Sequence, residues 1–246
     1  MLRDTRRMGS VAEHYRNLLA ENYTWMFGVP FDEKVAEQKA LLAGVLAGPG
    51  LAVDLGSGPG FQSIALADLG FSPVLAIDTS EELLQELEAH RGTRPIETQV
   101  GDISEFADSR QAAVVVCMGD TLTHLPSKDA VRAMFGAVAK RLVSGGKFVL
   151  TYRDLTATLA GTERFIPVRS DADRIMTCFL EYEGADFVQV TDLLHVRGEG
   201  EWLLQKSSYR KLRLSRGWVK QALTEAGFTA QTDGQAGRMS MVVASV

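Results

Sequence analysis

The sequence predicts an α/β fold, doubly wound around a mostly parallel seven-stranded sheet, with an inserted antiparallel β meander. Three observations predict it. Between residues 51 and 154, short apolar segments alternate with amphipathic helical ones, the rhythm of parallel βαβ units. A glycine-rich turn follows the first apolar segment. After residue 154, extended segments separated by glycines replace the alternation, which favours antiparallel hairpins.

The elements of the core follow in order along the chain. The segment 112–118 is a continuous apolar run, typical of a strand that helices cover on both faces. Ser80 precedes two glutamates and is expected to cap a helix N-terminus. We expect strands at 51–55, 73–77, 96–100, 112–118 and 147–152, and helices at 32–47, 61–69, 81–90 and 127–142.

The last third of the chain is expected to be mostly extended. Residues 173–183, 186–197 and 201–214 show partial alternation of apolar and polar residues, with glycines between them. A helix at 215–226 is expected, capped by Ser215 and ended by Gly227. Segments 228–233 and 239–245 then complete the core sheet as a pair of strands.

Composition limits the classes of function. The chain has 246 residues, 46% of them hydrophobic, and a formal net charge of −5. Nucleic-acid binders usually present a basic surface, so nucleic acid is not the expected partner. An apolar run of about 20 residues, as a membrane span requires, is absent. Only two cysteines are present, Cys117 and Cys178; a cytoplasmic location without a metal site is expected.

The sharpest motif is the run Val53-Asp54-Leu55-Gly56-Ser57-Gly58-Pro59-Gly60, between a strand and a helix. Glycines at alternate positions allow a tight turn and let a ligand lie against the backbone. An ordinary glycine-rich connection is the alternative. The motif by itself therefore indicates a ligand site without identifying the ligand.

Two acidic residues extend this motif. Asp78 ends the second strand, Asp102 ends the third, and the positions 54, 78 and 102 are each 24 residues apart. Doubly wound sheets bind ligands at the carboxyl ends of their strands. A carboxylate at Asp78 can accept hydrogen bonds from a ribose diol, and one at Asp102 from an adenine amine. For Asp78, capping of the next helix is the alternative.

A dinucleotide-binding enzyme is the main competitor. Its fingerprint, G-x-G-x-x-G, places a pyrophosphate on the helix N-terminus. Here the third glycine comes one position early, and Phe61 stands where it should be. Pro59 also lacks a backbone N–H donor. A ligand without a pyrophosphate fits this loop better.

Together, the glycine loop, Asp78, Gly101-Asp102 and the segment Leu142–Phe148 resemble the class I S-adenosylmethionine-dependent methyltransferase superfamily. The resemblance implies S-adenosylmethionine as cofactor, with Asp78 on the ribose and Asp102 on the adenine amine. A second, weaker resemblance is to small-molecule N-methyltransferases, such as those acting on glycine or amino sugars, and it rests on the segment Tyr23-Thr24-Trp25. The implied cofactor-binding residues are Tyr23, Trp25, Asp54, Gly56, Ser57, Gly58, Gly60, Asp78, Thr79, Asp102, Ile103 and Met118.

Candidates for the acceptor site follow strands four and five. His124, in the loop Gly119–Pro126, is the first candidate for a base or acceptor ligand; a structural histidine is the alternative. Tyr15 is a further catalytic candidate. Arg153 could bind an acceptor carboxylate or phosphate, or pair with Asp154 or Asp120. If two of Arg164, Arg169 and Arg174 met Arg153, the acceptor would be anionic.

The expected organisation follows from these assignments. Segment 1–50 is a helical and aromatic lid, in which Tyr15, Tyr23 and Trp25 cover the cofactor or pack on the sheet. Segment 51–154 is the cofactor-binding core, 155–214 an insertion for acceptor binding or dimer formation, and 215–246 the completion of the core. The expected function is methyl transfer to an amine or hydroxyl of a small molecule. Alternatives are an NAD(P)-dependent oxidoreductase, a non-catalytic S-adenosylmethionine-binding protein, or RNA modification, and a homodimer is left open.

Overall fold

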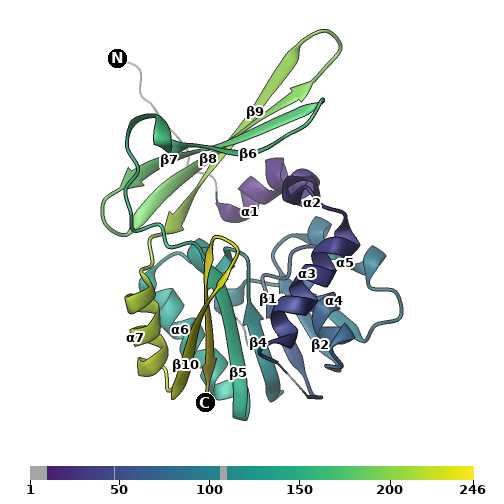
Figure 1. Cartoon of the computed structure of the whole chain (residues 1–246), viewed down its shortest axis with the longest axis vertical. Coiled ribbons are helices and arrows are strands. Elements are labelled where there is room, and N and C mark those ends of the chain that lie inside the picture. Colours follow the sequence, from purple (N-terminus) through teal and green to yellow (C-terminus); the bar gives the residue numbers. More distant parts are fainter. Residues whose placement is uncertain (1–9, 47, 106–109) are drawn as a thin grey trace.

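The computed structural model describes residues 10–46, 48–105 and 110–246 and contains two separate β-sheets. Figure 1 shows the larger sheet with helices on both faces and the smaller one beyond its upper edge. The larger sheet has seven strands in the order β10-β11-β5-β4-β1-β2-β3. The doubly wound fold expected from the sequence is thereby confirmed.

The parallel part of the larger sheet lies close to the positions predicted. Its strands are β1 (Ala52–Leu55), β2 (Val74–Asp78), β3 (Ile96–Val100), β4 (Ala112–Cys117) and β5 (Leu142–Tyr152). The final pair, β10 (Ala230–Ala236) and β11 (Met239–Ser245), is antiparallel and joins the sheet at β5. The main difference is β5, which begins five residues earlier than 147 because the chain is already extended when it leaves the preceding helix.

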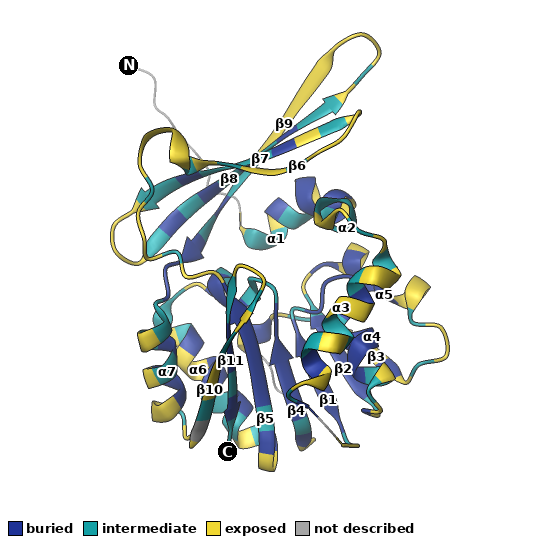
Figure 2. Cartoon of the chain, in the orientation of Figure 1, coloured by how far each residue is buried: buried dark blue, intermediate teal, exposed yellow. Residues whose placement is uncertain are grey.

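Helices cover both faces of this sheet. On one face lie α3 (Phe31–Ala43), α4 (Phe61–Asp68) and α5 (Glu81–His90), and on the other α6 (Lys128–Arg141) and α7 (Arg216–Glu225). Two buried clusters result, one on each face of the sheet. Figure 2 shows the central strands as buried along nearly their whole length. The predicted caps are confirmed, since Ser80 accepts the amide of Leu83 and Ser215 that of Trp218.

The insertion forms its own antiparallel sheet in the order β6-β7-β8-β9. Its strands are β6 (Phe165–Ser170), β7 (Arg174–Glu183), β8 (Phe187–Arg197) and β9 (Trp202–Leu212). The inserted antiparallel meander is confirmed, and the three extended segments predicted for it correspond to β7, β8 and β9; β6 is a fourth strand that the sequence did not predict. β6 is an edge strand, mostly exposed and irregular near Pro167, so it lacks the alternation that marks a half-buried strand.

The N-terminal segment is helical and lies between the two sheets (Figure 1). It consists of α1 (Val11–His14), a π-helical turn (Tyr15–Leu19), a 3-10 turn (Ala20–Asn22) and α2 (Tyr23–Phe27). Leu18 and Leu19 pack with Met176 and Leu194 of the smaller sheet. This segment therefore brings its aromatic residues between the insertion and the core. In the part of the chain that the structure describes, no helix is both long and apolar enough to cross a bilayer.

Candidate functional site

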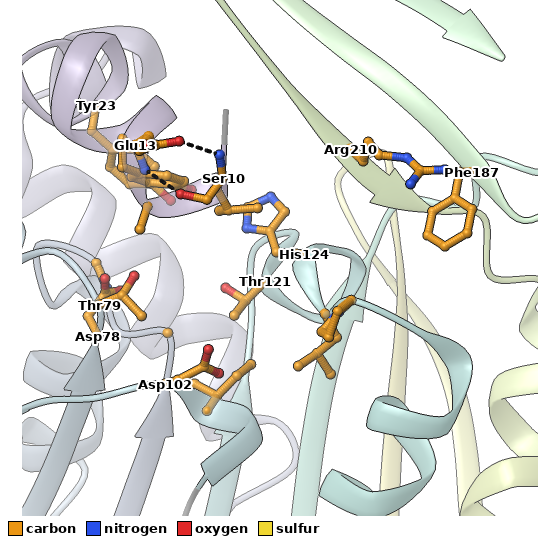
Figure 3. A pocket seen from close by; sticks show the side chains of 18 residues that line it. Ser10, Glu13, Tyr23, Asp78, Thr79, Asp102, Thr121, His124, Phe187 and Arg210 are labelled. Carbon is orange, nitrogen blue, oxygen red and sulfur yellow. Dashed lines mark hydrogen bonds between the residues drawn. The ribbon is translucent and has the colours of Figure 1, made fainter. Parts of the chain in front are cut away.

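A cavity of about 670 Å³ opens at the carboxyl ends of the parallel strands, between the core, the N-terminal helices and the insertion. This volume is in the ordinary range for small-molecule sites. Figure 3 shows Asp78, Thr79 and Asp102 on one side, and Thr121 and His124 in the middle. The residues predicted for the site that line this cavity are Tyr15, Tyr23, Gly56, Gly58, Asp78, Thr79, Asp102, Ile103 and His124.

The carboxylate of Asp78 is fixed by backbone amides at the tip of β2. Its Oδ2 accepts from the N–H of Gly58 at 2.8 Å, and its Oδ1 accepts from Ser80 at 2.9 Å. Burial raises the pKa of Asp78, and the hydrogen bonds from Ser80 and Gly58 act against that rise. Each carboxylate oxygen has two acceptor sites. Asp78 can therefore take two further hydrogen bonds from a ligand in the cavity, as a ribose diol requires.

Asp102 lies across the same cavity, after β3. It is exposed, and its Oδ1 accepts the amide of Ser104 at 2.8 Å. The buried side chain of Ile103 follows it and also lines the cavity. Asp78 and Asp102 thus face one common cavity, and an apolar side chain lies next to the second carboxylate.

The three glycines of the loop have different surroundings. A Cβ at Gly56 would lie 2.3 Å from Cγ2 of Thr121, and one at Gly58 would lie 3.5 Å from the ring of Tyr23. Both glycines line the cavity. Gly60 does not line it; a Cβ there would lie 2.1 Å from Cδ1 of Leu87 on α5. The first two glycines keep the cavity floor open, whereas the third allows helix packing.

Asp54, predicted for the cofactor site, is buried behind the loop and does not line the cavity. Its Oδ2 accepts from Ser63 Oγ at 2.6 Å. Burial raises the pKa of Asp54 to about 7, in spite of the Ser63 hydrogen bond and with a further contribution from Asp78. Asp54 on β1 thus binds Ser63 on α4, and this hydrogen bond holds together the two elements that the glycine loop connects.

The raised pKa of Asp54 makes a pH-dependent contribution to stability. Because its folded pKa is about 7 against an ordinary 3.8, this contribution is complete below pH 4 and is lost as pH rises through 7. Relative to Asp54→Asn, the unfolding free energy of the unliganded wild type should fall by about 2–3 kcal/mol between pH 5 and pH 8. Urea unfolding of both proteins at the two pH values measures this difference. A constant difference would contradict the assignment.

A row of aromatic rings crosses the roof and middle of the cavity. The ring of Tyr23 lies 6.0 Å from that of Tyr15, and Tyr15 lies 5.9 Å from His124, edge to face. His124 in turn meets Tyr209 of β9 at 5.5 Å, and Tyr209 stacks on His14 at 4.1 Å. Edge-to-face and stacked pairs at these distances are favourable. The row connects the glycine loop, the N-terminal segment, the loop after β4 and the insertion.

His124 is neutral at physiological pH. Burial lowers its pKa to about 3, the Lys211 ammonium lowers it further, and Asp120 partly opposes them. Its Nε2 is buried and has no hydrogen-bond partner among the described residues. A neutral ring nitrogen can accept a hydrogen bond. His124 thus lines the cavity, and its Nε2 is an unused acceptor that is covered in this structure.

Comparison with known proteins agrees with this geometry. Residues 52–146 match the family model described as "Methyltransferase domain". Residues 52–146 are a methyltransferase domain. The match covers the glycine loop, both cavity aspartates and the loop of His124. The expected resemblance to class I methyltransferases is thereby confirmed for the core, and the sheet order fits it.

Solved structures share the fold over nearly the whole chain. An S-adenosylmethionine-dependent methyltransferase from Clostridium acetobutylicum is 17% identical, with a TM-score of 0.72 over 96% of this chain and 97% of that one. The CcbJ methyltransferase from Streptomyces caelestis is 20% identical, with a TM-score of 0.74 over 94% and 97%. CalS10, an amino pentose methyltransferase from Micromonospora echinaspora, is 19% identical, with a TM-score of 0.72 over 92% and 96%. The comparison with curated protein sequences gave no significant match.

The methyltransferase domain is joined to the insertion by a buried ion pair. Lys211 of β9 binds Oδ2 of Asp120, whose Oδ1 accepts the amide of Arg153 at 3.0 Å and the Thr123 hydroxyl at 3.1 Å. Burial acts to raise the pKa of Asp120, but the Lys211 charge and the hydrogen bonds from Lys211 and Arg153 outweigh it, so the pKa lies below its usual value. The pair holds the loop that carries His124 against β9.

Some residues predicted for the site lie outside the cavity. Trp25 donates to Asp171 and stacks under Arg169 and Arg174 of the insertion. Arg153 is half-exposed, with its Nε 3.7 Å from Asp120, which is the ion pair considered as its alternative role. Three further residues predicted for the cofactor site are buried and do not line the cavity: Ser57 and Gly60 in the glycine loop, and Met118 after β4.

Other cavity residues escaped prediction. The N-terminal turn Ser10–Glu13 lines the cavity, and its serine and glutamate form a capping box. The signature S-x-x-E was visible in the sequence and could have placed a helix start there. Thr121, Leu125 and Pro126 also line the cavity, next to His124. Phe187 and Arg210 come from the insertion. No motif or spacing in the sequence places these two residues near the glycine loop.

Proposed function

We propose that this protein is an S-adenosylmethionine-dependent methyltransferase that methylates an amine or hydroxyl of a small molecule. The observation that carries the proposal is the common cavity of Asp78 and Asp102, beside two glycines that keep its floor open. A nucleoside with a free ribose diol is complementary to this arrangement.

The residues present fit the cofactor. Asp78 keeps two acceptor sites after binding the amides of Gly58 and Ser80, enough for two ribose hydroxyls. Asp102 is exposed at the next strand end and suits an adenine amine. The cofactor supplies a methyl group already activated on a sulfonium, so the protein has no bond to activate there.

The protein aligns the acceptor and excludes water. Tyr15 and Tyr23 roof the cavity, and such alignment can lower a barrier by several kcal/mol, about 7 or more in favourable cases. His124 can accept a hydrogen bond from an acceptor N–H or O–H through its unpaired Nε2. With a pKa of about 3, it orients the acceptor lone pair and is too weak a base to keep the proton, which passes on to solvent.

Several features support a small-molecule acceptor. The cavity is bordered by the insertion and the N-terminal turn, and the net charge of −5 disfavours nucleic acid. Among similar structures, one protein is named an amino pentose methyltransferase and another a sugar N-methyltransferase. Within this proposal, segment 155–214 is the acceptor-binding part and segment 1–50 the lid. Two cysteines without a disulfide fit the proposed cytoplasmic location.

Calorimetry tests the cofactor assignment. We expect S-adenosylmethionine and S-adenosylhomocysteine to bind, and NAD to give no heat. Absence of binding at millimolar ligand would remove the proposal, and selective NAD binding would favour an oxidoreductase. Cofactor binding without methylation of any compound in a broad acceptor screen would favour a non-catalytic binding protein.

Asp78→Ala should weaken S-adenosylhomocysteine binding by about 1–3 kcal/mol, because two buried ligand hydroxyls lose their acceptor. Asp68→Ala is the matched control, since that carboxylate pairs with Arg94 and does not line the cavity. Its dissociation constant should equal that of the wild type. If Asp78→Ala also binds normally, the ribose assignment is wrong.

A further inference from the structure

The end of the cavity far from Asp78 has a different chemistry. In Figure 3, Phe187 and Arg210 lie on the side opposite Asp78, with His124 between the two ends. Both come from the insertion, Phe187 at the start of β8 and Arg210 on β9. A ligand placed at the Asp78 end leaves this end for a second molecule.

Arg210 is held in a defined orientation. Its guanidinium carbon lies 4.1 Å from the centre of the Phe187 ring, and its Nε lies 2.8 Å from Oε2 of Glu183. One face and one edge of the planar group are thereby in contact with protein. Nε is buried and makes only this ion-pair contact, and among the described residues neither terminal nitrogen of Arg210 donates a hydrogen bond to another residue. An arginine oriented in this way is prepared to bind an anion through both nitrogens.

The turn beside Arg210 carries two carboxylates, and each has a cation beside it: Arg210 for Glu183 and Lys128 for Asp186. Arg213 is buried, and its guanidinium donates to the carbonyl of Gly184, next to Glu183. The other acceptors of Arg213 are also uncharged, namely two carbonyls and a threonine hydroxyl. Arg213 therefore adds to this region a positive charge that no carboxylate among the described residues pairs, and Glu183 is partly screened because its side chain is 36% exposed.

Arg210 also differs in charge from the other ionised groups of the cavity. Among the described lining residues, Glu13, Asp78 and Asp102 are acidic, and Arg210 is the one arginine or lysine. Asp78 and Asp102 lie at the end of the cavity proposed for the nucleoside, and Glu13 lies in the N-terminal turn (Figure 3). An anion entering this cavity is thus attracted toward Arg210 and repelled from Asp78.

We propose that Arg210 is a specificity-determining residue and that the methyl acceptor carries an anionic group, a carboxylate or a phosphate, which binds the terminal nitrogens of Arg210. The acceptor amine or hydroxyl then lies toward His124, in the middle of the cavity. This inference rests on the proposed function and adds to it the chemical class of the acceptor: a bifunctional small molecule with an anion at the end away from the methylated atom.

The test uses the full-length protein saturated with S-adenosylhomocysteine. Sodium phosphate and sodium acetate are titrated separately at constant ionic strength, and the Nε–H signals of the arginines are followed by NMR. We expect a saturable shift of the Arg210 signal. Phosphate should bind more tightly if the acceptor carries a phosphate, and acetate if it carries a carboxylate. Arg210→Gln should weaken the anion affinity, read from neighbouring amides, at least tenfold. Arg197→Gln, an exposed arginine beside Trp202 and Asp173, should leave it unchanged.

A turnover assay with matched amines gives a second readout. Each pair consists of an amine with a carboxylate or phosphate and its neutral amide or alcohol. For an anionic substrate, Arg210→Gln should raise KM at least tenfold with little change in kcat. An Arg210 signal that neither anion moves, or a preference for the neutral members, would overturn the inference. Failure of S-adenosylhomocysteine to bind in the loading step would instead overturn the proposed function, and this inference with it.

Discussion

Lys211→Met should lower the free energy of unfolding by about 3–5 kcal/mol at neutral pH, because it leaves a buried carboxylate without its counter-ion. Lys211 is 9% exposed and binds Asp120, which is held in place by further hydrogen bonds from Thr123 in its own loop and from the amide of Arg153, directly after β5. The carboxylate cannot turn to solvent without breaking those bonds. Urea or thermal unfolding of the purified protein measures the loss.

Two controls separate charge from packing. In Asp120→Asn/Lys211→Met both charges are gone, and most of the lost stability should return, since replacing both members of a buried pair is often nearly neutral. Lys220→Met removes the lysine of an exposed pair with Asp233, and should change stability by about 1 kcal/mol or less. If Lys211→Met proves as mild as Lys220→Met, the pair makes no such contribution.

The core was predictable because its signals are local. The central parallel strands β1, β2 and β4 are short apolar runs, and the topology of such sheets fixes where the strand ends meet. Asp78 and Asp102 could therefore be placed in one cavity without coordinates. The residue that follows each strand carries the information, and it is read directly from the sequence.

The end of the cavity that Phe187 and Arg210 line was not predictable, because no local signal in the sequence marks it. Phe187 and Arg210 reach the cavity only because the insertion folds over the core, and this docking depends on long-range contacts. The buried His14, 3.0 Å from Asp192 and stacked on Tyr209, is one such contact between segments far apart in the chain. Neither spacing nor periodicity records which residues of an antiparallel insertion will face the site.

The glycine loop shows how a correct motif can carry an incomplete assignment. All of its glycines were expected to border the cofactor, yet Gly60 borders Leu87. Glycine is required there by a positive φ and by a close approach, and the sequence pattern does not distinguish these requirements from contact with a ligand. Substitution of Gly60 is therefore expected to lower the stability of the protein, and not its affinity for the cofactor.

Gly60→Ala should destabilise the protein by about 2–5 kcal/mol, combining the strain of a left-handed alanine with overpacking. Gly60 has a φ of +93°, and its added Cβ would lie 2.1 Å from Leu87 Cδ1 and 2.9 Å from Cγ. Gly70 offers a matched control, because its φ is also +93° but nothing lies within 4 Å of an added Cβ. Gly70→Ala should therefore cost about 1–2 kcal/mol, the conformational part alone.

The difference between the two variants isolates the packing between α4 and α5. In a Leu87→Ala background the obstructing side chain is shortened, so Gly60→Ala should approach the effect of Gly70→Ala, and the double-mutant cycle should give a favourable coupling between residues 60 and 87. Equal destabilisation by Gly60→Ala and Gly70→Ala in the wild type would show that α5 moves freely to make room. The positive φ of Gly60 would then be the requirement that explains the third glycine, and its packing against Leu87 would carry no measurable energy.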